Sequence, residues 1–270
     1  MKTITVCILL CLMVECTQAE NPVWVHIDDG FMYTKFRAPA TSFSADSTIT
    51  VVRIDPRRYN LKLCTVSELG GENRTVREWT EEFGLICAFN AGMYLTDYKT
   101  NCGYMKNHAH FNNKRINKTY HSFVAFNPVQ SDDAPFRIFD DEVTRADTII
   151  NRYRTVIQNL RLVKRSALNR WGRQEKRWSE VALGEDRSGN VLVIFSRMPM
   201  TMFDFNELVL SLPIGLQCAQ HLEGGPEASL YINHNGVEIA RTGSYGADCG
   251  SENSDTLFRQ LPNVIGVVKR

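Results

Sequence analysis

After its N-terminal region the sequence contains no long hydrophobic run, and its positive and negative charges nearly cancel. The 31 lysines and arginines and the 30 aspartates and glutamates give a net charge of +1. A membrane-spanning helix requires about 20 mostly apolar residues, and attraction to nucleic acid or anionic lipid requires an excess of positive charge. We therefore expect no transmembrane segment after the N-terminal region and no nucleic-acid partner.

Closely spaced cysteine pairs are also absent, and five of the eight cysteines lie beyond residue 20. None of these five has the CxxC spacing of a zinc cluster, so we predict no structural metal site. Cys87 and Cys218 lie in apolar, strand-like runs and are expected to be small core residues. A disulfide between Cys102 and Cys249 is an open alternative, because a sequence alone cannot pair cysteines.

Residues 1–19 have the features of a secretory signal peptide. Lys2 precedes an apolar run from Thr5 to Val14, and Thr17-Gln18-Ala19 places small residues where signal peptidase cleaves. A lipid-modified Cys16 is a weaker alternative, because Glu15 before it does not suit a lipoprotein signal. We expect a mature chain of residues 20–270 in a secreted, periplasmic or extracellular location.

Internal repeats, low-complexity tracts and long linkers are missing too, and the expected strands outnumber the helices. This pattern favours an α+β fold, with a single domain over residues 20–270 built on a large mixed β-sheet with a few packed helices. Capping-box spacings predict helices that begin near Thr75 and at Asp204. The main expected strands are 47–55, 59–66 as its antiparallel return, 85–89, 122–126, 178–183, 191–195 and 264–268.

The stretch from Cys218 to Asn235 carries the strongest local signal. Its centre, Glu223-Gly224-Gly225-Pro226-Glu227, combines residues that permit or impose a sharp turn between two strand-like runs. Such a turn presents Glu223 and backbone amides at a sheet edge, and our hypothesis is that an anionic substrate is held and a glycosidic bond attacked there. The glycines beside Glu223 are hard to explain by packing alone.

Other polar residues in strand-like or aromatic segments are further candidates. Asn90 and Gly92 follow an apolar strand and place a polar side chain and a tight bend at its end, although a structural turn explains them equally well. His108 and His110 have the alternate spacing of residues on one strand face. Because no third ligand follows at defined spacing, hydrogen-bonding roles are favoured over metal binding.

Arg161 lies in the hydrophobic element 153–163 and needs either an anionic partner or a wet cleft. Its planar guanidinium suits a phosphate, and an internal ion pair is the alternative. It also begins the single basic block of the chain, residues 161–177, which Trp171 and Glu175 interrupt. We interpret most of that block as a solvated surface.

Several segments, taken in order, resemble the phosphodiester glycosidase family. Asn90-Ala-Gly-Met-Tyr94 is similar to an Asn-Gly-Gly-Phe segment of that family, and Ala182 to Gly189 is similar to an Ala-x-Gly-x-Asp-x-x-Gly hairpin. Leu222 to Ser229 resembles a Leu-Asp-Gly-Gly-Gly-Ser segment, with Glu223 in place of the usual aspartate and Pro226 in place of a third glycine. The resembling blocks extend from about residue 45 to residue 270.

The resemblance implies a hydrolase that cleaves the bond between C1 of a sugar and a phosphate oxygen, with a sugar-phosphate or glycan substrate. The transition state of such a reaction resembles an oxocarbenium ion, and the phosphomonoester is a good leaving group. One carboxylate to stabilise the cation or activate water, with donors that hold the phosphate, is then sufficient. No cofactor is specified; a divalent cation that helps to hold the phosphate is left open.

We assign roles to the candidates on this basis. Glu223 is the expected catalytic carboxylate, and Asp97 or Glu227 is the second, although both also suit surface turns. The candidates for substrate binding are Asn90, Gly92, His110, Arg161, Gly224, Gly225 and Ser229. The alternatives are another envelope glycosidase or phosphodiesterase acting on exopolysaccharide, and a carbohydrate-binding protein without turnover. Oligomeric state is left undetermined by these patterns.

Overall fold

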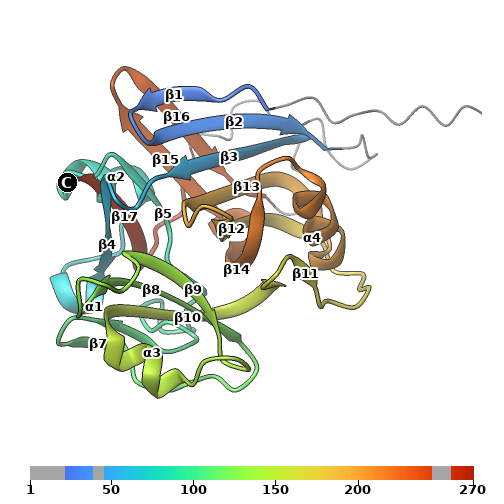
Figure 1. The fold of residues 1–270 in the computed structure, drawn as a ribbon. Helices are drawn as coiled ribbons and strands as arrows, with labels where there is room; N and C mark the ends of the chain where they lie inside the picture. Colours follow the sequence, from blue (N-terminus) through green and yellow to red (C-terminus); the bar gives the residue numbers. More distant parts are fainter. Residues whose placement is uncertain (1–21, 39–45, 245–256) are drawn as a thin grey trace, which may run out of the picture.

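Two β-sheets form the framework of the computed structural model, which describes residues 22–38, 46–244 and 257–270 (Figure 1). The expected signal peptide, residues 1–19, and Cys249 lie outside the described residues. Along its main path the larger sheet has the order β1 (Val25–Asp28), β2 (Phe31–Arg37), β3 (Thr48–Ile54), β13 (Val191–Met200), β12 (Trp178–Asp186), β14 (Leu216–Gly224), β10 (Tyr153–Lys164), β6 (Met105–Asn107) and β7 (His110–Asn113).

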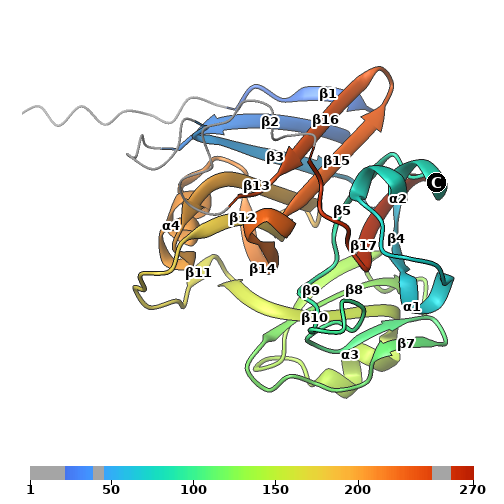
Figure 2. The same cartoon turned by 180° about the vertical axis from the view of Figure 1, so that it is seen from behind.

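Three further strands extend the larger sheet, and five strands form the smaller one. β8 (His121–Pro128) pairs with β10 and with β9 (Phe136–Asp140), and β11 (Leu168–Asn169) pairs with β10. The smaller sheet has the order β16 (Val237–Thr242), β15 (Ser229–His234), β5 (Cys87–Asn90), β17 (Asn263–Lys269) and β4 (Tyr59–Thr65). The β15–β16 hairpin crosses the β1–β3 region in Figure 2, and the Asn235 amide at its tip donates to the Ile27 carbonyl oxygen, 3.0 Å away.

Strand alternation explains why the large sheet has an apolar core on each face. β13 is buried at every position, and successive side chains of a strand point to opposite faces. Val191, Val193 and Phe195 join the core between the two sheets, whereas Leu192 and Ile194 pack on the other face with Phe205 and Val209. Each face of the strand is therefore covered, and the helix that carries Phe205 completes the second core.

In the part of the chain that the structure describes, four helices cover the edges and faces of the sheets. They are α1 (Val66–Leu69), α2 (Val76–Glu82), α3 (Ala146–Arg152) and α4 (Met202–Ser211). The predicted capping box begins α2, because the Thr75 hydroxyl accepts from the Glu78 amide and the Glu78 carboxylate accepts from the Thr75 amide. No helix within the described ranges is long and apolar enough to cross a membrane.

The α+β class and the large sheet are confirmed, and three details of the prediction are corrected. Every strand pair among the described residues is antiparallel, so neither sheet is mixed there. β4 pairs with β17 in the smaller sheet and not with β3, because hydrophobic alternation alone does not choose a partner strand. α4 begins after Thr201, whose hydroxyl accepts from the Asp204 amide, so the cap precedes the predicted one.

Candidate active site

A β-bulge at Leu222 shapes the end of β14 where the candidate site lies. Val181 of β12 pairs with Glu223, and the next residue, Ala182, pairs with His221, so Leu222 has no partner opposite it. Leu222 enters the core between the two sheets, whereas His221 and Glu223 line one pocket together. At the bulge, the ionisable side chains of His221 and Glu223 therefore lie on the same face of the strand.

The pocket beside Glu223 has a volume of about 590 Å³ and lies at the margin of the second core. Its walls come from the end of β14, the start of β12, the segment before it, and residues from other parts of the chain. The lining residues are Met93, Leu160, Trp171, Lys176, Arg177, Trp178, Met202, His221, Glu223, Gly224 and Gly225. Two tryptophans, two cations and a carboxylate thus face one space of the size that small ligands occupy.

The pKa of Glu223 is raised from 4.5 to about 7, chiefly by burial in this pocket and to a smaller extent by the charges of Glu227 and Glu180. The charge of His221 and a 3.0 Å hydrogen bond from the Gly224 amide to Oε1 oppose this effect. Among the described residues Oε2 has no hydrogen-bond partner. Glu223 is therefore held by one oxygen and can exchange a proton near neutral pH, as an acid or base catalyst requires.

His221 belongs to a buried chain of hydrogen bonds that forms one wall of the pocket. Its Nδ1 lies 2.6 Å from Oε1 of Glu180, and both side chains are only 3% exposed. The Trp178 indole donates to Oε2 of Glu180 at 3.0 Å. Burial acts to lower the pKa of His221, but the Glu180 carboxylate outweighs it and raises this pKa above its ordinary value. These hydrogen bonds hold both His221 and Trp178 next to Glu223.

Gly224 allows the Trp178 ring to lie directly against the strand. A Cβ atom on Gly224 would lie 2.4 Å from Cδ1 of Trp178, so any side chain would displace the indole. Gly225 follows with a φ of +67°, a conformation that favours glycine, and it begins the 3-10 turn η1 (Gly225–Glu227). Both glycines of the motif are therefore explained by the geometry of the pocket wall and of the turn.

Asn90 lies beneath this turn and connects it to the smaller sheet. Its amide nitrogen donates to the Glu227 carbonyl oxygen at 3.0 Å, and its Oδ1 accepts from the Ser229 amide at 2.7 Å. The Ser229 hydroxyl also donates to the Glu227 carbonyl oxygen. The structure thus brings Asn90, Ser229 and Glu227 to the Glu223 turn, but Asn90 and Ser229 use their polar atoms to hold its backbone.

Gly92 is packed against two buried asparagines. A Cβ atom there would lie 2.3 Å from Oδ1 of Asn159 and 2.7 Å from Oδ1 of Asn101. The Asn159 amide nitrogen donates to the Ala91 carbonyl oxygen at 2.9 Å. This packing fixes the chain just before Met93, which reaches the pocket.

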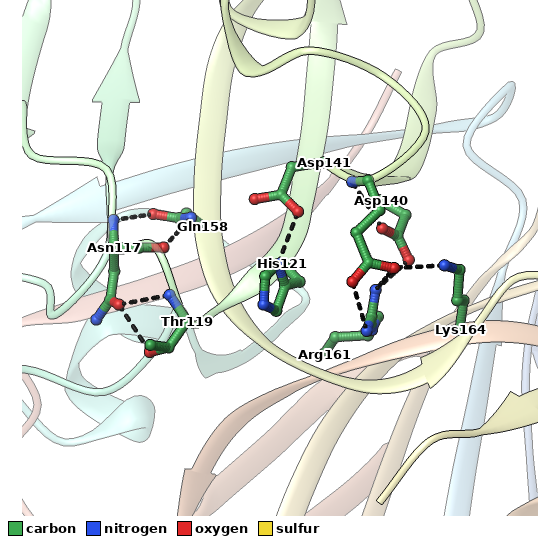
Figure 3. Close-up of polar contacts among 9 residues, drawn as sticks. Asn117, Thr119, His121, Asp140, Asp141, Gln158, Arg161 and Lys164 are labelled. Carbon is green, nitrogen blue, oxygen red and sulfur yellow. Dashed lines mark hydrogen bonds and ion pairs between the residues drawn. The ribbon is translucent and has the colours of Figure 1, made fainter.

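Arg161 lines a neighbouring pocket of about 250 Å³ instead of the Glu223 pocket. The two pockets share Leu160 and Trp171 as a dividing wall. Figure 3 shows Arg161 beside Asp140. Nη1 of Arg161 lies 2.6 Å from Oδ2 of Asp140 and 3.0 Å from Oε2 of Glu142. The predicted need for an anionic partner is met within the protein. Neither of these two pockets, as the described residues line them, contains Asn90, Arg161 and Glu223 together.

Asp97 and His110 do not line the pocket. The Asp97 carboxylate accepts from the Thr100 hydroxyl and from the Thr100 and Lys99 amides, and these hydrogen bonds, with the Thr100 hydroxyl first, lower its pKa. His110 lies on β7 and its Nε2 is 2.9 Å from the Ser67 hydroxyl. His108 lies in the turn between β6 and β7. The two histidines therefore do not lie on one strand, in contrast to what their alternate spacing indicated.

The described part of the chain contains neither a disulfide nor a candidate metal site. Cys87 and Cys218 are buried core residues, as predicted, and Cys102 forms no disulfide with a described residue. Within residues 22–38, 46–244 and 257–270 no group of three His, Cys, Asp or Glu side chains has the geometry of a metal site.

Five aromatic, basic or histidine residues that line the pocket were not among the candidates from the sequence: Trp171, Lys176, Arg177, Trp178 and His221. The spacing His221-x-Glu223 and the spacing Trp178-x-Glu180 each place two residues on one face of a strand, which is a usable signal. Lys176 and Arg177 close the basic block that we interpreted as a solvated surface. That interpretation missed the proximity of the segment to β14, which only the strand pairing reveals.

Comparison with known proteins identifies relatives of this architecture. The phosphodiester glycosidase family model matches residues 83–268, more than half of the chain. No curated protein has a sequence that matches this chain significantly. Low-identity structural neighbours share the fold.

One structural neighbour is a hypothetical protein from Synechocystis, with a TM-score of 0.65 and 12% identity over 93% of this chain and 64% of that one. This chain thus spans less than two thirds of that neighbour. The catalytic domain of zebrafish N-acetylglucosamine-1-phosphodiester alpha-N-acetylglucosaminidase, auto-inhibited by its pro-peptide, has a TM-score of 0.63 and 12% identity over 89% and 84%. A putative exported protein from Burkholderia pseudomallei has a TM-score of 0.53 and 8% identity over 82% and 74%.

The family match includes β14, the η1 turn and Glu223. It also includes the Trp178, Glu180 and His221 chain on the pocket wall. The chain therefore belongs to the phosphodiester glycosidase family.

Proposed function

We propose that this protein is a secreted hydrolase that cleaves the glycosidic bond of a sugar-1-phosphodiester and releases free sugar and a phosphomonoester. The observation that carries this proposal is Glu223, whose pKa is raised to about 7 in a pocket that also contains tryptophans and cations. Membership of the phosphodiester glycosidase family supports the reaction class. The name of the zebrafish neighbour suggests N-acetylglucosamine-1-phosphodiesters as the first substrates to test.

In this proposal the aromatic residues of the pocket bind the sugar and its basic residues bind the phosphate. The aromatic faces of Trp171 and Trp178 pack against the sugar ring. Lys176 and Arg177 attract the phosphate, and of the two Lys176 has no ion-pair partner among the described residues, whereas Arg177 lies 3.8 Å from Asp204. The sugar carbon C1 then lies between Glu223 and the leaving phosphate.

The proposed reaction uses Glu223 in its ionised form. The carboxylate accepts a proton from water while the water oxygen bonds to C1, and the bond between C1 and the phosphate oxygen breaks with its electron pair leaving on the phosphomonoester. Because a phosphomonoester is a good leaving group, no strong general acid is needed. Glu227 is the candidate second carboxylate, since its charge already acts on Glu223.

The proposed role of Asn90, Gly92 and Ser229 is to position the backbone of the site. Gly224 forms part of the pocket wall, and Gly225 begins the turn. Arg161 remains a candidate for contacts to the alcohol side of the substrate, because its pocket adjoins that of Glu223. Asp97 and His110, which lie away from the pocket, take no part in the proposed step.

The decisive experiment compares Glu223→Gln with Glu227→Gln, a matched change in the same turn, on N-acetylglucosamine-1-phosphodiesters. We expect Glu223→Gln to lower kcat by about 10² to 10⁴, the range for an acid or base catalyst, and Glu227→Gln to lower it less. Unchanged hydrolysis by Glu223→Gln contradicts the catalytic assignment. Substrate binding by the unaltered protein without turnover favours a carbohydrate-binding role instead.

The bond that breaks can be identified in ¹⁸O-labelled water. Attack at C1 leaves the phosphomonoester without ¹⁸O, whereas attack at phosphorus introduces the label into the phosphate, and ³¹P NMR distinguishes the two. Label in the phosphate identifies the alternative, a phosphodiesterase, and contradicts the proposed reaction.

Secretion is a separate part of the proposal and rests on residues 1–19. Expression with the natural N-terminus in a secreting host is expected to release a protein that begins near Glu20. N-terminal sequencing of the released protein checks the cleavage position, and retention of residues 1–19 on the cell-associated protein contradicts it.

A further inference from the structure

A second pocket of about 380 Å³ lies at the opposite end of β14 from Glu223. Gln217, near the start of β14, lines it, whereas Glu223 is near the end of the same strand. Six strand residues separate positions of this kind by roughly 20 Å. The two pockets share no lining residue, so the second one is a separate site.

Four arginines line this second pocket: Arg57, Arg137, Arg165 and Arg187. Glu185 is the one carboxylate among the described residues that line it, and a second, Asp55, holds Arg57 from outside through two hydrogen bonds of 2.8 and 2.9 Å. Four positive and two negative groups leave a local charge of +2, although the whole chain has a net charge of only +1. The pocket therefore concentrates positive charge.

The buried Glu185 carboxylate, 1% exposed, fixes two of these guanidinium groups. Its Oε1 accepts from Nη1 of Arg137 at 2.8 Å, and its Oε2 accepts from Nη2 of Arg165 at 2.5 Å and from the Ile138 amide at 2.9 Å. Both oxygens are thus covered by donors, which reduces the repulsion of an anion in the pocket. Nη2 of Arg165 also donates to the Ile138 carbonyl oxygen at 3.3 Å and to Sγ of Cys218 at 3.2 Å. Each guanidinium has five N–H donors, so both arginines keep donors that these contacts do not use.

Arg187 differs from the other three arginines that line the pocket, because each of those is paired with a carboxylate. The backbone amide of Arg187 donates to the Gly215 carbonyl oxygen, but its guanidinium has no ion-pair or hydrogen-bond partner among the described residues. An exposed, unpaired arginine beside two arginines that are held in place is a suitable arrangement for a tetrahedral oxyanion, which guanidinium groups bind through paired donors.

We propose that this arginine pocket binds a phosphate or sulfate ester on a sugar. Its volume of about 380 Å³ lies in the range of small-ligand sites and exceeds what an inorganic ion alone requires. The site would hold a charged unit of a glycan away from the Glu223 pocket. The proposal concerns binding only, so it stands or fails independently of the hydrolysis proposed above.

Isothermal titration calorimetry with glucose 6-phosphate, glucose 6-sulfate and glucose tests the proposal. Saturable binding of at least one ester without binding of glucose is expected, and a comparison of the two esters identifies the preferred oxyanion. Inorganic phosphate shows whether the sugar contributes to affinity. Absence of saturable binding by both esters overturns the proposal.

Arg187→Gln is the informative variant, because it removes an exposed cation that has no hydrogen-bond or ion-pair partner among the described side chains. We expect affinity for the preferred ester to fall about tenfold, the order expected for a lost charge-assisted hydrogen bond, with an unchanged Tm. Arg115→Gln is the matched control, since it removes an exposed arginine that lines none of the pockets described here. Hydrolysis of the sugar-1-phosphodiester by Arg187→Gln is expected to stay unchanged.

Lys176→Gln distinguishes this pocket from the Glu223 pocket. If the ester binds at the Glu223 site, Lys176→Gln weakens binding and Arg187→Gln does not, and that outcome overturns the proposal. Equal losses in Arg187→Gln and Arg115→Gln also overturn it, because they indicate attraction to overall charge. Loss in Arg187→Gln alone supports it.

Discussion

Burial in the pocket gives the Glu223 carboxyl a pKa that suits proton transfer. This pKa is raised to about 7 mainly because the pocket removes water from the carboxyl, while the Gly224 amide keeps one oxygen in place. A carboxyl in this range is populated in both protonation states near neutral pH. In the proposed reaction, the same environment therefore makes hydrolysis sensitive to pH.

The first prediction concerns this pH dependence. If ionised Glu223 activates water, kcat/KM rises with pH and reaches half of its maximum near pH 7. Initial rates on a sugar-1-phosphodiester between pH 5 and 9 check this, and the limb should disappear in the residual activity of Glu223→Gln. A limb that instead falls through pH 7 shows that the protonated form is active and contradicts the assigned role.

The second prediction concerns Glu180, which contacts His221 at 2.6 Å. Glu180→Gln removes the carboxylate that raises the pKa of His221, so this pKa is expected to fall. NMR titration of the His221 imidazole measures the change. We also expect kcat/KM to fall about tenfold, as for a lost charge-assisted hydrogen bond.

Glu175→Gln is the control for this experiment, because Glu175 is an exposed carboxylate on the segment before Trp178. It should leave both the His221 titration and kcat/KM unchanged. An unaltered His221 titration in Glu180→Gln would show that the buried contact does not set the charge of His221.

At the scale of elements, strand β14 and the η1 turn determine the site. β14 belongs to the larger sheet, and β15, which follows η1, belongs to the smaller sheet. The bulge at Leu222 keeps that side chain in the core between the sheets while His221 and Glu223 face the pocket. The turn therefore lies where the chain passes from one sheet to the other.

A third prediction tests the fit between β14 and Trp178. Gly224→Ala places a methyl group where the indole ring lies, with 2.4 Å between the new Cβ and Cδ1 of Trp178. We expect a loss of stability of about 1–3 kcal/mol from overpacking and a fall in kcat/KM, measured by urea denaturation and initial rates.

Gly172→Ala is the matched substitution, since a Cβ at Gly172 meets no atom within 4 Å and its φ is not in the left-handed region. It should leave stability and kcat/KM close to those of the unaltered protein. Similar losses in both variants would show that the Trp178 contact is not the cause.

At the scale of the whole molecule, the raised pKa of Glu223 links folding to pH. In the unfolded chain this carboxyl titrates near 4.5, whereas in the folded protein it titrates near 7. Between these values the unfolded state binds fewer protons than the folded state, so the free energy of unfolding falls as pH rises. Below pH 4.5 the penalty is absent, and above pH 7 it is complete.

The fourth prediction follows from this sign. Relative to the unaltered protein, Glu223→Gln gains about 3 kcal/mol in the free energy of unfolding between pH 4.5 and pH 7.5. Urea denaturation at several pH values measures the difference between the two proteins, which cancels contributions from other groups. A difference that does not change with pH contradicts the raised pKa.

Much of the fold could be predicted from the sequence, because its signals are local. The Thr75 capping box begins α2, Asn235-Gly236 forms the turn between β15 and β16, and the runs around Val181 and Val193 form a hairpin. The partner of β4 could not be predicted, since its alternation is compatible with either sheet. Strand partners depend on long-range packing that a single sequence does not display.

The turn of the candidate site could also be predicted from local signals, whereas the partners of its other residues could not. The glycines beside Glu223 drew attention to the turn, because glycine tolerates close approach and left-handed backbone. Arg161 was placed with a phosphate because a guanidinium in an apolar run lacks a visible partner, but Asp140 and Glu142 approach it from segments about 20 residues earlier. His221 was overlooked because its Glu180 partner is 41 residues distant.

The hydrogen bonds of Asn90 have a consequence for folding kinetics. They join the η1 turn to a residue 137 positions earlier in the chain, so the turn reaches its final geometry only after a large loop has closed. Loop closure over such separations is slow compared with the formation of local hairpins. During refolding from urea, strand circular dichroism is therefore expected to recover before enzymatic activity, and simultaneous recovery would show that the site assembles with the first sheet.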